Sequence, residues 1–192
     1  MSYKIEKISP EISNHLPDLV VDYVNGVEFL KPFYQYTPNI NSFKQIIEDR
    51  KKHPVNRKAL VETLKEQYKD ISEKPLLDVL LDEKTFTITT GHQLCLFTGP
   101  IYFIYKIATT INLANQLKKE YPEYNFVPVY WMASEDHDID EIKGLYLNGE
   151  QLDSEISYSG IAGELPTNLL SDFIDEVEQK VKFNKELFEV FK

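Results

Sequence analysis

The 192-residue sequence is poor in cysteine, and its single thiol, Cys95, cannot form a disulfide within the chain. It also lacks any apolar run near the roughly 18 to 20 residues that cross a bilayer. The N-terminus has neither the basic start nor the apolar stretch of a signal peptide. These absences predict a protein of the reducing cytoplasm with no membrane partner.

Basic residues are also scarce, because 21 Lys and Arg stand against 31 Asp and Glu, for a formal net charge of −10. This balance argues against nucleic acid as a partner, since a general nucleic-acid binder needs a basic face. A local site for one nucleotide remains open, because it can oppose the overall charge. The content of 42% hydrophobic and 27% charged residues is typical of a globular protein.

Residues 1–82 are predicted to form a helical N-terminal arm that packs on the core. Ser42 and Gln45 fit a capping box at the start of one helix, and Asn56 can cap the next helix. The inner stripe of that second helix is predicted to consist of Leu60, Leu64 and Tyr68.

A strand–helix–strand pattern in residues 83–143 predicts the core of an α/β fold. The β-branched run Thr85–Thr90 predicts a strand that ends at Gly91, and Phe126–Trp131 predicts a second strand. The long connection between them favours parallel pairing. Because open parallel sheets bind ligands beyond the carboxyl ends of their strands, we expect the two loops that follow these strands to meet in one pocket.

The helix between these strands is expected to open at Pro100, with Thr98 or Gly99 as its cap. Its predicted apolar stripe consists of Ile101, Ile104, Tyr105, Ala108, Ile111 and Leu117.

Residues 144–192 are interrupted by glycines at short intervals and are interpreted as the start of a further module. Their amphipathic helix is predicted from the spacing of Leu169, Leu170, Phe173, Ile174, Val177 and Val181.

The loop after the first strand can place backbone N–H groups and a helix N-terminus at the mouth of the sheet. That arrangement suits a phosphate or carboxylate, although a purely structural turn fits the pattern equally well. His92 can donate to an anion or carry a proton, or can simply hydrogen-bond the turn. Gln93 can bind at the same mouth, and Lys106 can reach back toward it from the helix.

Each of three further residues near this loop has two possible roles. Tyr102 and Tyr105 can face either the site or the core, and the sequence does not choose between them. Cys95 lies near a helix N-terminus, which can lower the pKa of a thiol. Its apolar neighbours favour the simpler interpretation, a small apolar filler.

The segment after the second strand, Ser134–Glu141, holds five carboxylates and His137. The carboxylates can hold Mg²⁺ that bridges nucleotide phosphates. Alternatively, Asp136, His137 and Asp138 can bind a substrate amine or hydroxyl, or the run is an acidic helix start. A zinc site is not predicted, because no His/Cys pair has ligand spacing.

The two loops together resemble the cysteine ligases of bacillithiol biosynthesis, the cysteine-adding enzymes. The resemblance is carried by the segments Thr90–Gln93, Leu96–Tyr102, Tyr105-Lys106 and Val127–Asp138, with weaker support from Asp22-Tyr23, Phe33-Tyr34 and Ile47–Arg50. The sequence departs from the family pattern at two positions, where His92 replaces a more frequent Gln and Cys95 a more frequent Gly. The first change puts an obligatory histidine role in doubt, and the second argues against a thiol nucleophile.

The resemblance implies a Rossmann-like core related to class I synthetases and nucleotidylyltransferases. It further implies that residues 144–192 begin an inserted connective domain, and that a coiled coil in the full-length protein makes a homodimer. The chain would then be an N-terminal fragment, inactive alone. The implied reaction joins cysteine to the amine of glucosaminyl malate, with ATP as the expected cosubstrate and Mg²⁺ as a further candidate.

For this reaction the expected catalytic residues are Asp136 and His137. The residues expected to bind substrate or nucleotide are Gly91, His92, Gln93, Gly99, Lys106, Glu135 and Asp138. Two other hypotheses are a nucleotidylyltransferase-like enzyme acting on another small molecule and a non-catalytic binding or assembly module.

Overall fold

The structure is a computed structural model that describes residues 6, 8–13, 15–97, 99–184 and 188–189. The chain divides into two compact units, Met1–Lys74 and Pro75–Lys192. The predicted boundaries near residues 82 and 143 stay predictions. Within the described ranges, no helix combines the length and the apolar character that a membrane crossing requires.

The first unit is helical. Its elements are α1 (Pro10–Ser13), α2 (Asp18–Asn25), the 3₁₀ helices η1 (Glu28–Phe33) and η2 (Ile40–Ser42), α3 (Phe43–Lys51) and α4 (Arg57–Gln67). The predicted capping box is wrong, because the Ser42 side chain makes no cap and the Asn39 side chain instead accepts from the Ser42 amide. The predicted Asn56 cap is confirmed by its bond from the Ala59 amide, at 3.1 Å.

The predicted inner stripe of α4 is only partly correct. Leu64 and Tyr68 are half-buried, but Leu60 is exposed, and the buried side chain of this helix is Val61. The inward face is therefore rotated by about one residue from the predicted one.

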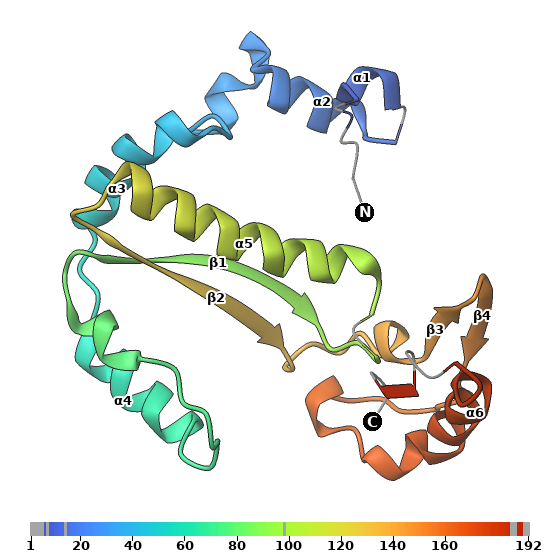
Figure 1. Ribbon diagram of the computed structural model, residues 1–192. Helices are drawn as coiled ribbons and strands as arrows, with labels where there is room; N and C mark the ends of the chain where they lie inside the picture. Colours follow the sequence, from blue (N-terminus) through green and yellow to red (C-terminus); the bar gives the residue numbers. More distant parts are fainter. Residues whose placement is uncertain (1–5, 7, 14, 98, 185–187, 190–192) are drawn as a thin grey trace. The chain divides into compact units, whose positions relative to one another are not determined.

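The second unit contains the expected parallel pair. Strand β1 (Thr85–Gln93) and strand β2 (Asn125–Ala133) run in the same direction, in register from Thr85 opposite Asn125 to Gln93 opposite Ala133. Helix α5 (Ile101–Glu120) connects them and lies along the sheet (Figure 1). The prediction of a strand–helix–strand unit is thus confirmed.

Strand β1 is longer than predicted, since it continues through Gly91 to Gln93. Gly91 lies opposite Trp131, and a Cβ at this position would fall 2.9 Å from the Trp131 carbonyl oxygen. A glycine inside a strand permits this close approach of the neighbouring backbone instead of ending the strand.

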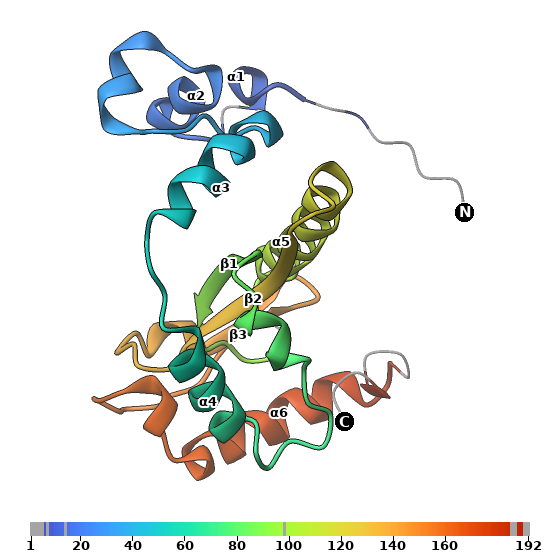
Figure 2. The same cartoon turned by 90° about the vertical axis from the view of Figure 1, so that its left-hand side faces the viewer.

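Helix α5 turns a different face to the sheet from the predicted one. Its buried residues are Thr110, Ala114 and Leu117, so the predicted stripe is confirmed only at Leu117. The other predicted residues are exposed, namely Ile101, Ile104, Tyr105, Ala108 and Ile111. Apolar residues surround much of this helix, so their spacing fits more than one face. Pro100 occupies the N-cap position itself, and Thr98 lies outside the described residues. Figure 2 shows α5 beside the strands from a second direction.

The remaining elements of this unit flank the strands. The 3₁₀ helix η3 (Leu77–Leu81) precedes β1, and η4 (Asp140–Ile142) leads into the antiparallel hairpin β3 (Gly144–Leu147) and β4 (Glu150–Asp153). After η5 (Ala162–Glu164) and η6 (Thr167–Leu170), helix α6 (Ser171–Val181) completes the unit. The hairpin and α6 lie beyond the carboxyl ends of β1 and β2 (Figure 1).

The predicted amphipathic helix corresponds to α6. It buries Phe173, Val177 and Val181 against Leu152 of the hairpin. Leu170 is also buried, but Leu169 is exposed, so the apolar face begins one residue later than predicted. This small core closes the end of the sheet at which ligands are expected.

Candidate functional site

His92 is the penultimate residue of strand β1 and is buried, with 5% of its surface exposed. Its Nδ1 donates to the Gln93 carbonyl at 2.9 Å, and its Nε2 shares a hydrogen bond with the Tyr102 hydroxyl. The Tyr130 hydroxyl donates to the His92 carbonyl at 3.4 Å. Because both ring nitrogens have partners, His92 holds the start of α5 to the end of β1.

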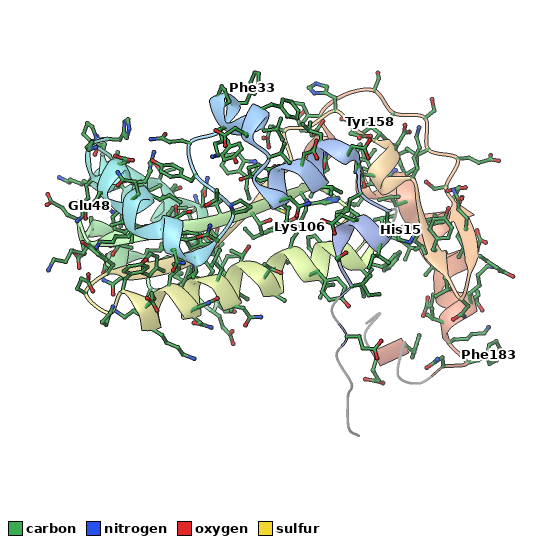
Figure 3. The ribbon with its side chains drawn as sticks, turned by 90° about the horizontal axis from the view of Figure 1, so that it is seen from above. His15, Phe33, Glu48, Lys106, Tyr158 and Phe183 are labelled. Atoms are coloured by element: carbon green, nitrogen blue, oxygen red, sulfur yellow. The ribbon has the colours of Figure 1, made fainter. Side chains whose placement is uncertain are left out.

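Lys106 lies on the face of α5 that meets β1 (Figure 3). Its Nζ donates to the Gly91 carbonyl at 3.1 Å and lies 5.2 Å from the centre of the Tyr102 ring. This cation therefore sits at the carboxyl end of β1, near the first turn of α5. Gln93 is half-buried at the same end, opposite Ala133.

The loop between β1 and α5 makes a tight turn that brings Gly99 against Cys95. Phe97 and Gly99 both have positive φ angles, 48° and 56°. A Cβ at Gly99 would fall 2.6 Å from Cys95 Sγ, so only glycine fits this turn. Burial, followed by the charge of Glu141, raises the pKa of the Cys95 thiol. A protonated, half-buried thiol supports its interpretation as a filler.

The acidic segment after β2 is more exposed and bonds mostly to its own backbone. Asp136 accepts from the Asp138 amide, and Asp138 accepts from the Asp140 amide, both at 3.1 Å. Glu135 accepts from the Trp131 indole at 3.2 Å. Asp136 is half-buried, while Glu135, His137 and Asp138 are exposed. Their side chains therefore keep free acceptor positions that solvent or a ligand can occupy.

The two loops meet at one edge of the sheet, as predicted. Ile139 of the acidic segment and Ile142 just after it form a buried cluster with Ala162, against which Leu94 and Leu96 of the first loop pack. The segment around Gly163 also holds the acidic loop, because its amide donates to the Ser134 carbonyl at 2.8 Å. A Cβ at Gly163 would fall at the same distance from that oxygen.

The predicted residues nevertheless do not all line the cavity at this edge of the sheet. A cavity of about 580 Å³ opens beside the first loop, and Gly99 is the one predicted residue among its lining. Glu141, which the sequence analysis did not single out, also lines it. No linear pattern separates Glu141 from its acidic neighbours, since only the fold of β3, β4 and α6 supplies the opposite wall.

The acidic side chains of this region are the candidate ligands for a metal ion. Across the parts of the chain that the structure describes, no three or more His, Cys, Asp or Glu side chains gather in a group able to hold a metal. The acidic segment therefore does not fit a magnesium ion held by protein ligands alone. The first amides of α5 and the Lys106 ammonium group are the features that suit a phosphate.

The sequence matches, over residues 3–192, the family described as "Bacillithiol biosynthesis BshC, N-terminal Rossmann-like domain". A relative from Flavobacterium psychrophilum is 49% identical over 86% of this chain and 33% of its own length. Relatives from Flavobacterium johnsoniae and Cytophaga hutchinsonii are 45% and 39% identical over 88% and 98% of this chain, and over 33% and 37% of their own lengths. Each is named "Putative cysteine ligase BshC".

The chain therefore spans about a third of the length of these relatives. The match and the parallel strand pair confirm the predicted Rossmann-like α/β fold and the family resemblance. This chain belongs to the BshC N-terminal Rossmann-like domain family of bacillithiol biosynthesis.

Proposed function

We propose that this chain supplies the Rossmann-like part of an ATP-dependent ligase that joins the carboxylate of cysteine to the amine of glucosaminyl malate. The reaction would complete bacillithiol synthesis. The chain covers a third of its relatives, so the proposal concerns the full-length protein, which we expect to be a homodimer.

One observation carries the proposal beyond the family match. The parallel register places His92 opposite Met132 and Gln93 opposite Ala133, so the glycine-containing loop and the acidic segment leave the sheet side by side. Ligands of open parallel sheets bind at this edge. The arrangement supports one site that receives an anionic group from one loop and an amine or hydroxyl from the other.

The chemistry follows from the low reactivity of a carboxylate. ATP would convert the cysteine carboxylate into an acyl adenylate or an acyl phosphate, releasing pyrophosphate or ADP respectively. Lys106 and the first amides of α5 would orient the phosphates. Asp136 or His137 would take the proton of the attacking ammonium group, whose amine then displaces AMP or phosphate to form the amide. Glu135 and Asp138 would hold the sugar-linked amine.

The proposal is tested by mass spectrometry of the full-length protein incubated with cysteine, glucosaminyl malate and ATP. We expect a product whose mass is the sum of cysteine and glucosaminyl malate minus water, together with stoichiometric AMP or ADP. Absence of this amide from a folded protein would overturn the proposal. A nucleotidylated small molecule formed with release of pyrophosphate, and no amide, would favour the nucleotidylyltransferase-like hypothesis.

A variant pair tests the role of Lys106. Lys106→Met should raise the KM for ATP about tenfold, because it removes a cation near the phosphates. Lys118→Met is the matched control, since Lys118 also donates to backbone carbonyls, at 2.9 Å and 2.8 Å, but from the other end of α5. Equal KM values for the two variants would contradict the role of Lys106.

A further inference from the structure

The cavity beside the first loop has a largely apolar wall. It lies between that loop, η4, the β3–β4 hairpin and α6, and it measures about 580 Å³. The apolar wall consists of Leu96, Phe97, Ile101, Leu145, Leu147, Val177 and Val181. Such a wall, with few polar groups, is typical of a small-molecule site.

The charged side chains that line this cavity are all acidic. They are Asp140, Glu141 and Asp153, and the described lining contains no Lys, Arg or His. A phosphate or a dicarboxylate would therefore meet three negative charges and no cation in this lining. The cavity is consequently unsuited to a nucleotide phosphate or to malate.

Two of these carboxylates are already satisfied within the protein. Asp140 forms an ion pair with Lys143 at 2.6 Å. Asp153 accepts from the Gln151 amide with both oxygens, at 3.0 Å and 2.9 Å.

Glu141 differs from both of its acidic neighbours. It is half-buried, and among the described residues its carboxylate has no hydrogen-bond or ion-pair partner. Its charge acts on the neighbouring first loop and on α5, since burial and then the Glu141 charge raise the pKa of Cys95 and of Tyr102. A partly desolvated carboxylate without a partner is a binding position for a cation.

We propose that this cavity binds a small molecule that carries a primary ammonium group on a short apolar chain, with Glu141 as its counter-ion. Within the proposed function, on which this assignment rests, that ligand is cysteine. Its ammonium would pair with Glu141, and its CH₂–SH group would contact the apolar wall. Its carboxylate would point away from the acidic side chains, toward the first turn of α5. Glucosaminyl malate, with two malate carboxylates, is excluded by the acidic lining.

The test compares two probes of nearly equal size, cysteamine and 2-mercaptoethanol, which differ in an ammonium against a hydroxyl group. Binding to the full-length protein is measured by calorimetry without ATP, so no catalysis is needed. Cysteamine should bind at least about tenfold more tightly than 2-mercaptoethanol, and glucosaminyl malate should not displace it. Equal affinities, or displacement by glucosaminyl malate, would overturn the assignment.

Variants locate the binding site. Glu141→Gln should weaken cysteamine binding about tenfold, whereas Glu150→Gln should not change it. The control removes the same charge from the hairpin that follows η4, but Glu150 lies outside the cavity and approaches Lys180 at 3.5 Å. Circular dichroism and thermal melting verify that both variants fold. Unchanged binding by folded Glu141→Gln would overturn the proposal.

The outcomes separate this inference from the proposed ligase. Glu141-dependent cysteamine binding in a protein that forms no amide product would retain the cavity assignment and reject the ligase. Amide formation by a protein that does not discriminate between the two probes would retain the ligase and reject the cavity assignment.

Discussion

The two loops at the carboxyl edge of the sheet use their polar side chains differently. At the two ends of the loop after β1, both ring nitrogens of His92 in β1 and the ammonium group of Lys106 in α5 bond to neighbouring residues. In the segment after β2, Glu135, His137 and Asp138 are exposed, and Glu141 has no bonding partner among the described residues. Position at a ligand-binding edge therefore does not by itself make a residue available to a ligand, because its hydrogen-bonding capacity must also be free.

The comparison assigns a structural role mainly to the first loop and a ligand-binding role mainly to the second. Both can contribute to one site, since the first loop also presents backbone amides and Lys106. Variants in both loops test this difference in role, and the largest effect is expected in the second loop.

The largest effect is expected at Asp136. Asp136→Ala in the full-length protein should lower amide product about 100-fold, because it removes an expected proton acceptor. Asp136→Asn is the matched variant, since an amide oxygen can still accept from the Asp138 amide as Asp136 does. Both should lose activity while remaining folded. Activity restored by Asn would show that Asp136 acts through loop geometry alone.

A substantial loss of stability is expected at His92. His92→Ala should lower the free energy of unfolding by about 2 to 4 kcal/mol, because it empties a buried position and leaves the hydroxyl of Tyr102 without its partner. Tyr102→Phe should cost about 1 kcal/mol. Urea denaturation measures both values.

His92→Gln tests whether the role of His92 is structural. An amide can replace part of the hydrogen bonding, so this variant should lose less stability than His92→Ala and keep its rate of amide formation. A rate loss of 100-fold in a stable His92→Gln protein would instead make His92 a catalytic residue and contradict the division between the loops.

A smaller effect is expected at Gly99. Gly99→Ala should lower the free energy of unfolding by about 1 to 2 kcal/mol, because alanine is strained at a φ of 56°. It would also contact Cys95 Sγ. In a Cys95→Ala background that sulfur is absent, so the cost should fall. An equal cost in both backgrounds, measured by urea denaturation, would place all the strain in the backbone.

The smallest effect concerns the pH at which Cys95 ionises. Burial and the Glu141 charge raise the pKa of its thiol, so the midpoint of alkylation against pH should lie above that of the urea-unfolded chain. Glu141→Gln removes a negative charge that disfavours the thiolate, so it should shift this midpoint slightly downward. An upward shift would contradict the placement of Glu141 near the first loop.

The sequence predicted the framework of the core more successfully than its details. The β-branched run before Gly91 and the apolar run before Met132 identified both strands, and the long connection between them indicated their parallel pairing. The end of β1 was placed too early, because glycine usually signals a turn, whereas Gly91 permits close contact with Trp131. Asn39 displaced the predicted cap of Ser42, and such competition between neighbouring polar side chains depends on backbone geometry.

The buried face of α5 and the wall of the cavity could not be predicted from the linear pattern. Ile104 and Tyr105 are as apolar as the residues that meet the sheet, so hydrophobic spacing alone does not choose between them. Glu141 becomes distinct only when β3, β4 and α6 form the wall opposite it. These features depend on tertiary packing, which overrides local periodicity.

We propose that both loops contribute to a single site at the carboxyl edge of β1 and β2. A crystal structure of the full-length protein with cysteine and a non-hydrolysable ATP analogue would test this arrangement. We expect phosphate density near Lys106 and the first turn of α5, with the cysteine ammonium group at Glu141. Both ligands bound with no contact to either loop would contradict it.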